Sequence, residues 1–313
     1  MSHLDFFCMS VTPFSKTGEV SEEVFHEFLD RMIDAKIGVF LGSGGAGEGH
    51  ALTTAELHHV YRSAAAYCKG KIPVHANLPE QHTASATCEQ AQIAIESGVE
   101  VVHLYTLEGR HGMRPTEMEV DAYLDAVLSA VNFPTAIAVS PSVLGYTPSA
   151  DVIARACRKH LHVKTVRLHN VPDTYLIDLK SKIDRDMSYY FQFSCGNFNP
   201  LAVGVNALFA VEANVIPKTC RAFLDCYEQG DRDGMMRAFI DLRRLDQYNQ
   251  KWLPGSARPL KMAIRALKLP GWEGGLRAPY LMPTDVEMEL YARGLFALGI
   301  QEIVDHASNT AKR

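Results

Sequence analysis

The sequence predicts an α/β protein built as a closed (β/α)₈ barrel with a C-terminal helical appendage. Strand-like and helix-like segments alternate strictly from residue 5 to about residue 230, which is typical of a parallel sheet. Eight such units in about 230 residues have the size of a closed barrel, and their near-even spacing favours it over an open doubly wound sheet. We therefore expect the barrel in residues 1–230 and a helical extension packed on it in residues 231–313.

Each unit begins with a short apolar or β-branched run. The first runs over residues 5–14 and ends at Pro13, and Ser21 can cap the helix that follows. That helix has apolar residues at helical spacing, namely Val24, Phe25, Phe28, Leu29 and Met32. The other predicted strands are 38–43, 72–78, 99–106, 135–141, 163–170, 189–196 and 207–214. The helices between them include 82–97, 115–131, 148–159 and 216–228.

Composition and charge exclude several classes of protein. The 313 residues are 47% hydrophobic and 21% charged with a net charge of −5, so nucleic acid and anionic membranes are poor partners. No apolar run reaches the roughly 20 residues of a membrane span, and residues 1–5 lack the pattern of a signal peptide. The seven cysteines are scattered without CxxC spacing, which indicates free thiols in a reducing compartment. We expect a cytoplasmic protein.

The segment from residue 163 to 170 carries the main functional signal. Side chains alternate along a strand, so Thr165, Arg167 and His169 share one face, and Lys164 lies on the other. A buried charge needs a partner. Arg167 is therefore either a clamp for a carboxylate or phosphate, or a structural cation paired with Glu48 or Glu212.

In such a barrel the active site lies where the strands end. The polar candidates there are Thr12, Ser43, Gly44, Gly45, Glu48, His75, Asn77, His103, Tyr105, Ser140, Arg167, His169, Ser194, Cys195 and Glu212. The turn over residues 42–47 can present backbone N–H groups to an anion, but it lacks the Lys-Ser/Thr of a nucleotide-binding loop.

A metal site is a weaker interpretation of the same strand ends. His75, His103, His169, Cys195 and Glu212 are all residue types that bind zinc. However, they show no local ligand spacing, and alternation does not turn all five inward. We predict no metal and no cofactor, and we expect His103 or His169 to act as a general acid or base if either is not simply a core histidine.

The chain resembles the dihydrodipicolinate synthase / N-acetylneuraminate lyase superfamily of pyruvate aldolases over nearly its whole length. The motifs that carry the resemblance are Val11–Phe14, Gly44–Glu48 with Leu52, Thr53 and Glu56, Pro73-Val74, Pro134 and Pro141, Ala213-Asn214, Gly230-Asp231, Pro259–Ala263 and Leu276–Pro283. The resemblance implies the barrel and its helical appendage. It also implies a lysine on the sixth strand that forms a Schiff base with pyruvate, and a homodimer or homotetramer.

At the chemistry-bearing positions the sequence departs from this family. Arg167 stands where the resemblance places the lysine, and a guanidinium is not an amine nucleophile. The tyrosine of the family's Tyr-Asn-x-Pro motif is Ala138, and the paired threonines of its Gly-Thr-Thr-Gly-Glu turn are Gly45 and Ala46. The arginine often found after the fifth strand falls near Val143. Ordinary imine chemistry is therefore not expected.

We expect a lyase-like enzyme that acts on a small 2-oxo or hydroxy carboxylic acid without a lysine imine. Arg167, His103, His169 and Tyr105 are its predicted catalytic residues. The predicted substrate-binding residues are Ser43, Gly44, Gly45, Glu48, Ser140 and Cys195, although Glu48 is also open to a structural role. Two alternatives remain, a non-catalytic carboxylate-binding or regulatory relative and a true Schiff-base aldolase that uses Lys164.

Overall fold

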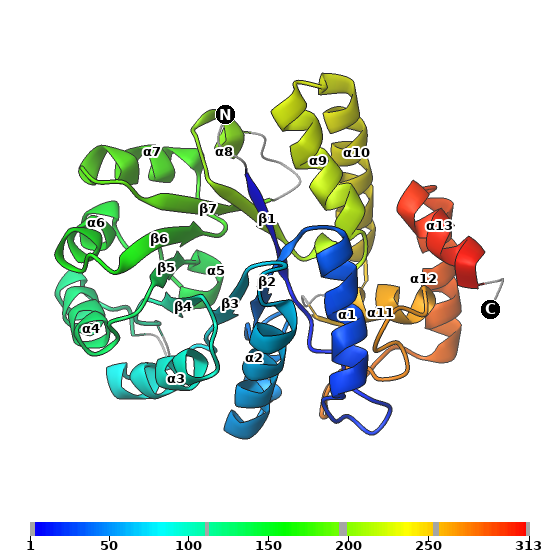
Figure 1. Ribbon diagram of the computed structural model, residues 1–313, viewed down its shortest axis with the longest axis horizontal. Helices are drawn as coiled ribbons and strands as arrows, with labels where there is room; N and C mark the ends of the chain where they lie inside the picture. Colours follow the sequence, from blue (N-terminus) through cyan, green and yellow to red (C-terminus); the bar gives the residue numbers. More distant parts are fainter. Residues whose placement is uncertain (1–3, 110–112, 194–198, 253–256, 311–313) are drawn as a thin grey trace.

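The computed structural model describes residues 4–109, 113–193, 199–252 and 257–310, and it confirms the predicted barrel. Eight parallel strands close in the order β1-β2-β3-β4-β5-β6-β7-β8, with β8 pairing back to β1 (Figure 1). Their bounds are β1 (Asp5–Met9), β2 (Gly38–Leu41), β3 (Val74–Asn77), β4 (Val101–Tyr105), β5 (Thr135–Val139), β6 (Val163–Leu168), β7 (Ser188–Gln192) and β8 (Ala207–Ala210).

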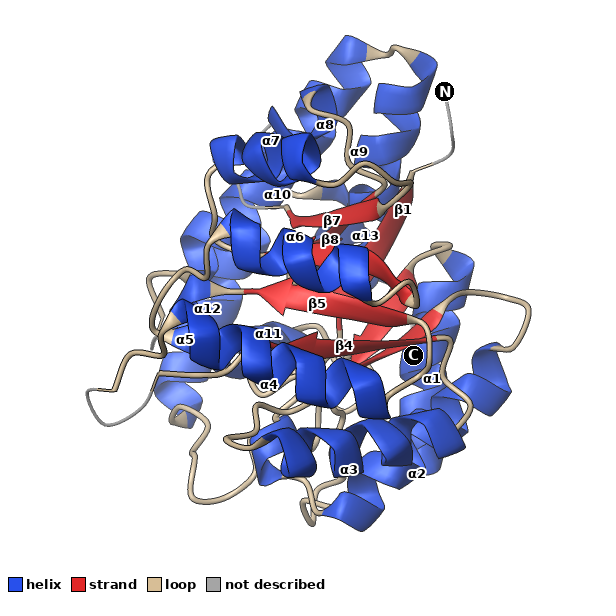
Figure 2. Ribbon diagram, turned by 90° about the vertical axis from the view of Figure 1, so that its left-hand side faces the viewer, coloured by secondary structure: helices blue, strands red, loops and turns tan. Residues whose placement is uncertain are grey.

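Helices surround the strands on the outside of the barrel, and Figure 2 shows the helical layer over β4 and β5. The helices that follow the first seven strands are α1 (Glu22–Asp34), α2 (Thr54–Cys68), α3 (Ala84–Glu96), α4 (Glu117–Ala130), α5 (Pro141–Leu144), α6 (Ala150–Lys159), α7 (Asp173–Lys182) and α8 (Asn199–Ala202). Thr53 and Thr116 cap α2 and α4 through capping boxes with Glu56 and Glu119. These side-chain caps fix where the long helices begin.

The predicted strands extend beyond the observed ones at their carboxyl ends. The segment from residue 163 to 170 was expected to be one strand, but β6 ends at Leu168. Asn170 has a φ of 53°, a left-handed conformation that a strand cannot contain. His169 therefore lies just beyond the strand, at the rim where the chain turns away.

Aromatic side chains fill the interior of the barrel. Phe7, Phe40 and Phe209 lie in the barrel interior and are each at most 1% exposed. The rings of Phe7 and Phe40 stack at 4.5 Å, and Phe40 lies 5.6 Å from Phe209. This layer closes the barrel below the carboxyl ends of the strands, so a ligand site can lie only above it.

The helices after β8 are α9 (Pro217–Gln229), α10 (Arg232–Asn249), α11 (Ala257–Ala266), α12 (Asp285–Ala297) and α13 (Gln301–Thr310). They lie to one side of the barrel in Figure 1. The loop before α12 is joined to the barrel by Arg277, which makes two 2.7 Å hydrogen bonds to the carboxylate of Glu56. Such a bidentate pair fixes geometry as well as contributing energy.

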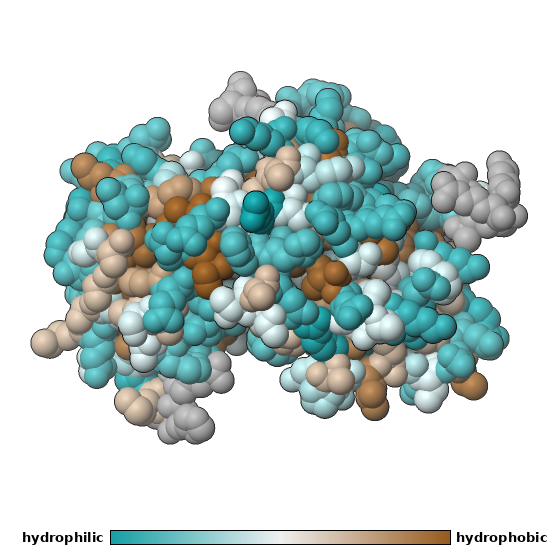
Figure 3. All heavy atoms as spheres, turned by 60° about the horizontal axis from the view of Figure 1, so that its bottom comes forward, coloured by the Kyte–Doolittle hydropathy of each residue, from teal (hydrophilic) through white to brown (hydrophobic). Residues whose placement is uncertain are grey.

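The surface is mixed in character. The face in Figure 3 is hydrophilic over most of its area, with hydrophobic atoms gathered in smaller patches. In and near α12 the exposed apolar side chains are Tyr280, Leu281, Val286, Leu290 and Phe296. No helix in the described part of the chain is both long enough and apolar enough to span a membrane.

Candidate functional site

Arg167 is the central residue of the site. It lies one residue before the end of β6, between Ala138 of β5 and Tyr190 of β7, and its side chain is only 1% exposed. The guanidinium carbon lies 5.2 Å from the ring centroid of Tyr105 and 5.5 Å from that of Phe209. A cation over aromatic faces is stabilised by their quadrupoles, so these rings partly offset the cost of burying the charge.

Among the residues that the structure describes, no carboxylate forms the ion pair with Arg167 that is expected for a structural cation. Nη1 approaches the sulfur of Met9 at 3.6 Å, a weak interaction. Within the described residues, neither Nε nor Nη2 has a hydrogen-bond partner. Nε and Nη2 form one edge of the planar group, and such an edge binds a carboxylate through two parallel hydrogen bonds. The arrangement can therefore hold a planar anion.

Arg167 is one of the residues that line a cavity of about 210 Å³ at the carboxyl ends of the strands. Six of the predicted site residues line it, namely Ser43, Gly45, Tyr105, Ser140, Arg167 and His169. The other lining residues are Met9, Ala46, Glu80, Ser142, Val143, Gln192, Phe209, Ala210 and Val211. No lysine is among these lining residues, and Lys164 is exposed on the outer side of β6.

His169 supplies the cavity with an imidazole. Its Nδ1 is hydrogen-bonded to the hydroxyl of Ser140 at 2.7 Å and to that of Ser142 at 3.2 Å. Burial and then the positive charge of Arg167 lower the pKa of His169 to about 4. The ring is therefore neutral near pH 7, and a neutral imidazole can accept a proton from a bound molecule.

Glu80 is a cavity residue that the sequence interpretation missed. It follows β3 by three residues, and only His75 and Asn77 were considered at that strand end. Its carboxylate lies against Gly44, where any Cβ atom would collide with it. Burial raises the pKa of Glu80 and Glu108 adds to the rise, whereas a hydrogen bond from its own backbone N–H and the charges of Arg167 and His50 oppose it. A signal was present in the sequence, because an acidic residue just after a strand end can reach the rim.

His103 is placed below the cavity and does not line it. Its Nε2 is hydrogen-bonded to Nδ1 of His75 at 3.0 Å, and its ring packs against Phe40 at 4.5 Å. Burial lowers the pKa of His75 to about 3, and burial, then His75 and Arg167, lower the pKa of His103 well below its usual range. The two rings form a neutral pair inside the barrel.

The remaining predicted residues have other positions. Glu48, which is 2% exposed, forms an ion pair with Lys261 of α11 and accepts a hydrogen bond from the backbone N–H of Arg277 at 3.0 Å. Gly44 does not line the cavity but supports Glu80, and its carbonyl accepts a hydrogen bond from His50 at 2.7 Å. Cys195, like Ser194, lies outside the described residues.

The described members of the considered metal set, three histidines and Glu212, do not all come together. His75 and His103 face each other, His169 contacts serines at the rim, and burial raises the pKa of Glu212 to about 8. In the described ranges, no group of three or more histidine, cysteine, aspartate or glutamate residues could hold a metal ion.

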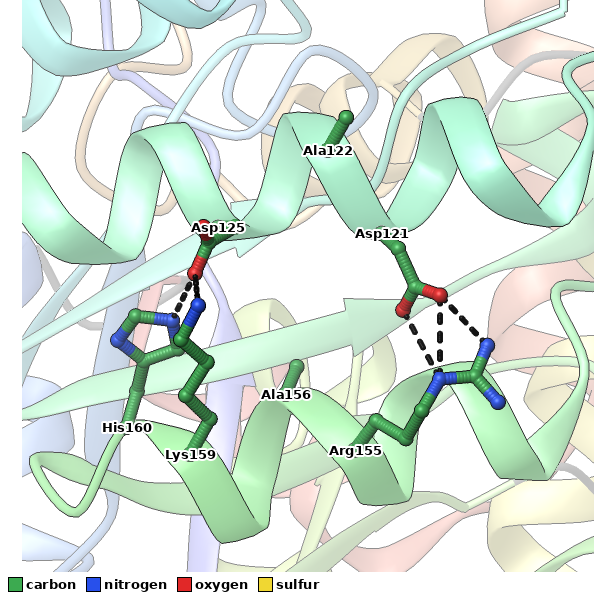
Figure 4. A pocket seen from close by; sticks show the side chains of 7 residues that line it. All are labelled: Asp121, Ala122, Asp125, Arg155, Ala156, Lys159 and His160. Carbon is green, nitrogen blue, oxygen red and sulfur yellow. Dashed lines mark hydrogen bonds and ion pairs between the residues drawn. The ribbon is translucent and has the colours of Figure 1, made fainter.

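A second hollow, of about 300 Å³, lies on the outside of the barrel between α4 and α6 (Figure 4). Its charges are already paired with one another. Arg155 binds Asp121 at 2.7 Å, and Asp125 contacts Lys159 at 2.5 Å and His160 at 3.0 Å. Since its cations already have carboxylate partners, this hollow offers an anionic ligand less than the free edge of Arg167 does.

The chain is similar in sequence to proteins of one known family. The sequence model of the dihydrodipicolinate synthetase family matches residues 4–291. A 4-hydroxy-tetrahydrodipicolinate synthase of Oleidesulfovibrio alaskensis is 24% identical over 299 residues, covering 92% of this chain and 95% of the relative. A protein of the same name from Exiguobacterium sibiricum is 25% identical over 235 residues, covering 74% and 77%.

Solved structures show the same fold at lower identity. YagE, a prophage protein of the dihydrodipicolinic acid synthase family from E. coli K12 solved with pyruvate, has a TM-score of 0.83 and 17% identity, covering 96% of this chain and all of that one. The 4-hydroxy-tetrahydrodipicolinate synthase of Methylacidiphilum fumariolicum SolV has a TM-score of 0.84 and 16% identity, covering 97% and 98%.

The family match extends over the barrel and continues through α10 and α11 into α12. The cavity lies at the carboxyl ends of the strands, where the sequence placed it. On this match, the chain belongs to the dihydrodipicolinate synthetase family.

Proposed function

We propose that the cavity binds a small 2-oxo or hydroxy carboxylic acid through Arg167, and that the protein is a lyase which works without a lysine imine. The observation that carries the proposal is the buried guanidinium of Arg167, a residue that lines the cavity and whose Nε and Nη2 have no hydrogen-bond partner among the described residues. The family match supports lyase chemistry in general, and one structural relative is solved with pyruvate.

The lining residues suggest how such a reaction proceeds. Retro-aldol cleavage of a C–C bond leaves negative charge as an enolate, and so does loss of the α-proton before a C–O bond breaks and the oxygen departs with the electron pair. An imine would accept that charge as a neutral enamine, whereas here the fixed cation of Arg167 stabilises it electrostatically. The neutral imidazole of His169 and the hydroxyl of Tyr105 both line the cavity and are the groups we assign to proton transfer.

Deuterium exchange tests the proposal without knowledge of the full substrate. Enolisation replaces the C3 protons of a 2-oxo acid by deuterium in D₂O, which NMR follows directly. We expect the protein to accelerate exchange in pyruvate or 2-oxobutyrate, and Arg167→Met to abolish the acceleration. Lys164→Ala is the matched control, because Lys164 is exposed on the opposite face of β6; it is expected to leave exchange unchanged.

Borohydride trapping with pyruvate separates this proposal from imine chemistry. Intact mass is expected to show no adduct, since the lining residues of the described cavity include no lysine. A reduced adduct on any lysine would overturn the proposal and restore the Schiff-base alternative. Ligand binding without any exchange or cleavage would instead support the non-catalytic carboxylate-binding relative.

We also propose that the protein forms a homodimer or homotetramer. Val286 and Leu290 lie one turn apart on α12 and are 68% and 49% exposed, and Leu281 in the preceding loop is 75% exposed. Apolar groups gathered in this way favour burial against a second copy. Light scattering coupled to size-exclusion chromatography measures the mass, and a monomer at micromolar concentration would contradict the proposal.

A further inference from the structure

The cavity carries two charged groups of opposite sign that do not pair with each other. Glu80 follows β3 and Arg167 lies near the end of β6, so they enter from strands that are three apart in the closed order. No ion pair or hydrogen bond joins them in the described structure, although the charge of Arg167 acts on the carboxyl group of Glu80. A ligand can therefore lie between the guanidinium of Arg167, a hydrogen-bond donor, and the carboxylate of Glu80, a hydrogen-bond acceptor.

The position of Glu80 is set by its surroundings. Its carboxylate packs against Gly44 in the turn after β2, where a Cβ atom would displace it. Its own backbone N–H donates to it, and no side chain among the described residues does, so part of its acceptor capacity is left for a bound molecule. The turn after β2 and the Glu80 side chain line the cavity together. The carboxylate gives this part of the lining a negative charge, in contrast to the positive guanidinium of Arg167.

We propose that Glu80 determines specificity, and that the site prefers acids bearing a hydrogen-bond donor, such as a hydroxyl or an ammonium group, over simple 2-oxo acids. The inference rests on the proposed function, in which Arg167 holds the carboxylate of the ligand. A hydroxyl or ammonium group can donate to the carboxylate of Glu80. A 2-oxo group offers only lone pairs and leaves two acceptors facing each other.

The preference has an expected size and an expected pH dependence. One hydrogen bond to a charged group changes affinity by about 10- to 100-fold, and the half-buried position of Glu80 favours the lower end. The groups that face Glu80 are Glu108, Arg167 and His50, and burial with Glu108 raises its pKa. When Glu80 gains a proton it becomes a donor, so the preference is lost or reversed toward 2-oxo acids at acidic pH.

Calorimetric titration of the full chain with a matched set of three-carbon acids tests the inference. The set is propionate, pyruvate, both lactate enantiomers, 3-hydroxypropionate and alanine, at pH 8 and pH 5. At pH 8 the tightest donor-bearing acid is expected to bind about tenfold or more tightly than pyruvate. Glu80→Gln carries both a donor and an acceptor at every pH and is expected to remove the difference.

Glu108→Gln is the matched control. Glu108 does not line the cavity but raises the pKa of Glu80, so its loss is expected to keep the preference at pH 8. It should also move the pH at which the preference disappears to a lower value. Thermal unfolding of each variant shows whether the fold is retained.

The outcomes separate the two proposals. Carboxylic acids that bind wild type but not Arg167→Met, with no preference between donor-bearing and 2-oxo acids, would overturn the role of Glu80 alone. The same conclusion holds if the preference persists in Glu80→Gln. If no acid of the set binds to wild type, the proposed carboxylate site fails and the inference fails with it.

Discussion

Replacing Arg167 by methionine is expected to stabilise the fold while removing ligand binding. The side chain is 1% exposed and two of its nitrogens have no partner among the described residues. An unpaired buried charge costs several kcal/mol, and the aromatic rings around it offset part of that cost. We expect the free energy of unfolding to rise by about 1–3 kcal/mol, which corresponds to a higher melting temperature by about 2–6 °C.

The same substitution removes two charge-assisted hydrogen bonds from the site. Each is worth about 1.5–3 kcal/mol, so the affinity for a carboxylic acid is expected to fall by at least about 100-fold. Guanidinium unfolding followed by circular dichroism measures the stability, and calorimetry measures the affinity. A gain in stability together with a loss of binding is typical of a functional cation.

Arg221→Met provides the matched control, because Arg221 is a buried arginine with partners. It is 6% exposed, and it binds Asp225 at 2.7 Å and the carbonyl of Leu4 at 2.9 Å. Its loss leaves these acceptors unpaired and is expected to destabilise the protein by about 1–3 kcal/mol. If Arg167→Met destabilises the protein to the same extent, the reasoning is refuted and Arg167 is structural.

Three further predictions concern buried groups outside the cavity. Glu48→Gln is expected to destabilise the fold by about 3 kcal/mol in urea unfolding, because it leaves the buried ammonium group of Lys261 unpaired, and a neutral result would argue against that pair. Burial raises the pKa of Glu212 from 4.5 to about 8, so the native state holds a proton that the unfolded state releases, and stability falls between pH 5 and 8. Glu212→Gln should flatten that fall in guanidinium titrations at the two pH values, and an unchanged slope would contradict the assignment. Burial lowers the pKa of His75 from 6.5 to about 3, so the unfolded state binds the extra proton and stability falls as the pH drops below 6.5. His75→Gln should lessen that loss between pH 6 and 4, while an equally steep loss would point to other groups.

The sequence determined the strand and helix alternation and the face on which Arg167 lies. A period of two specifies which side of a strand a residue occupies, and the length of each unit leaves little room for other topologies. This is why Arg167 was placed inside and Lys164 outside, and why Tyr105 and Ser140 were expected at the rim. These positions depend on local pattern, which a single sequence contains.

Only the tertiary structure decided how deep each residue lies and which one it meets. His103 faces inward as its strand position allows, but the stagger between strands places it below the rim, beside His75. Glu48 has a φ of 51° and pairs with Lys261, a residue far away in the chain. Glu80 enters the cavity beside Gly44, whose missing Cβ leaves room for its carboxylate. Such encounters arise from packing between distant segments, and the periodicity of a single strand or helix does not encode them.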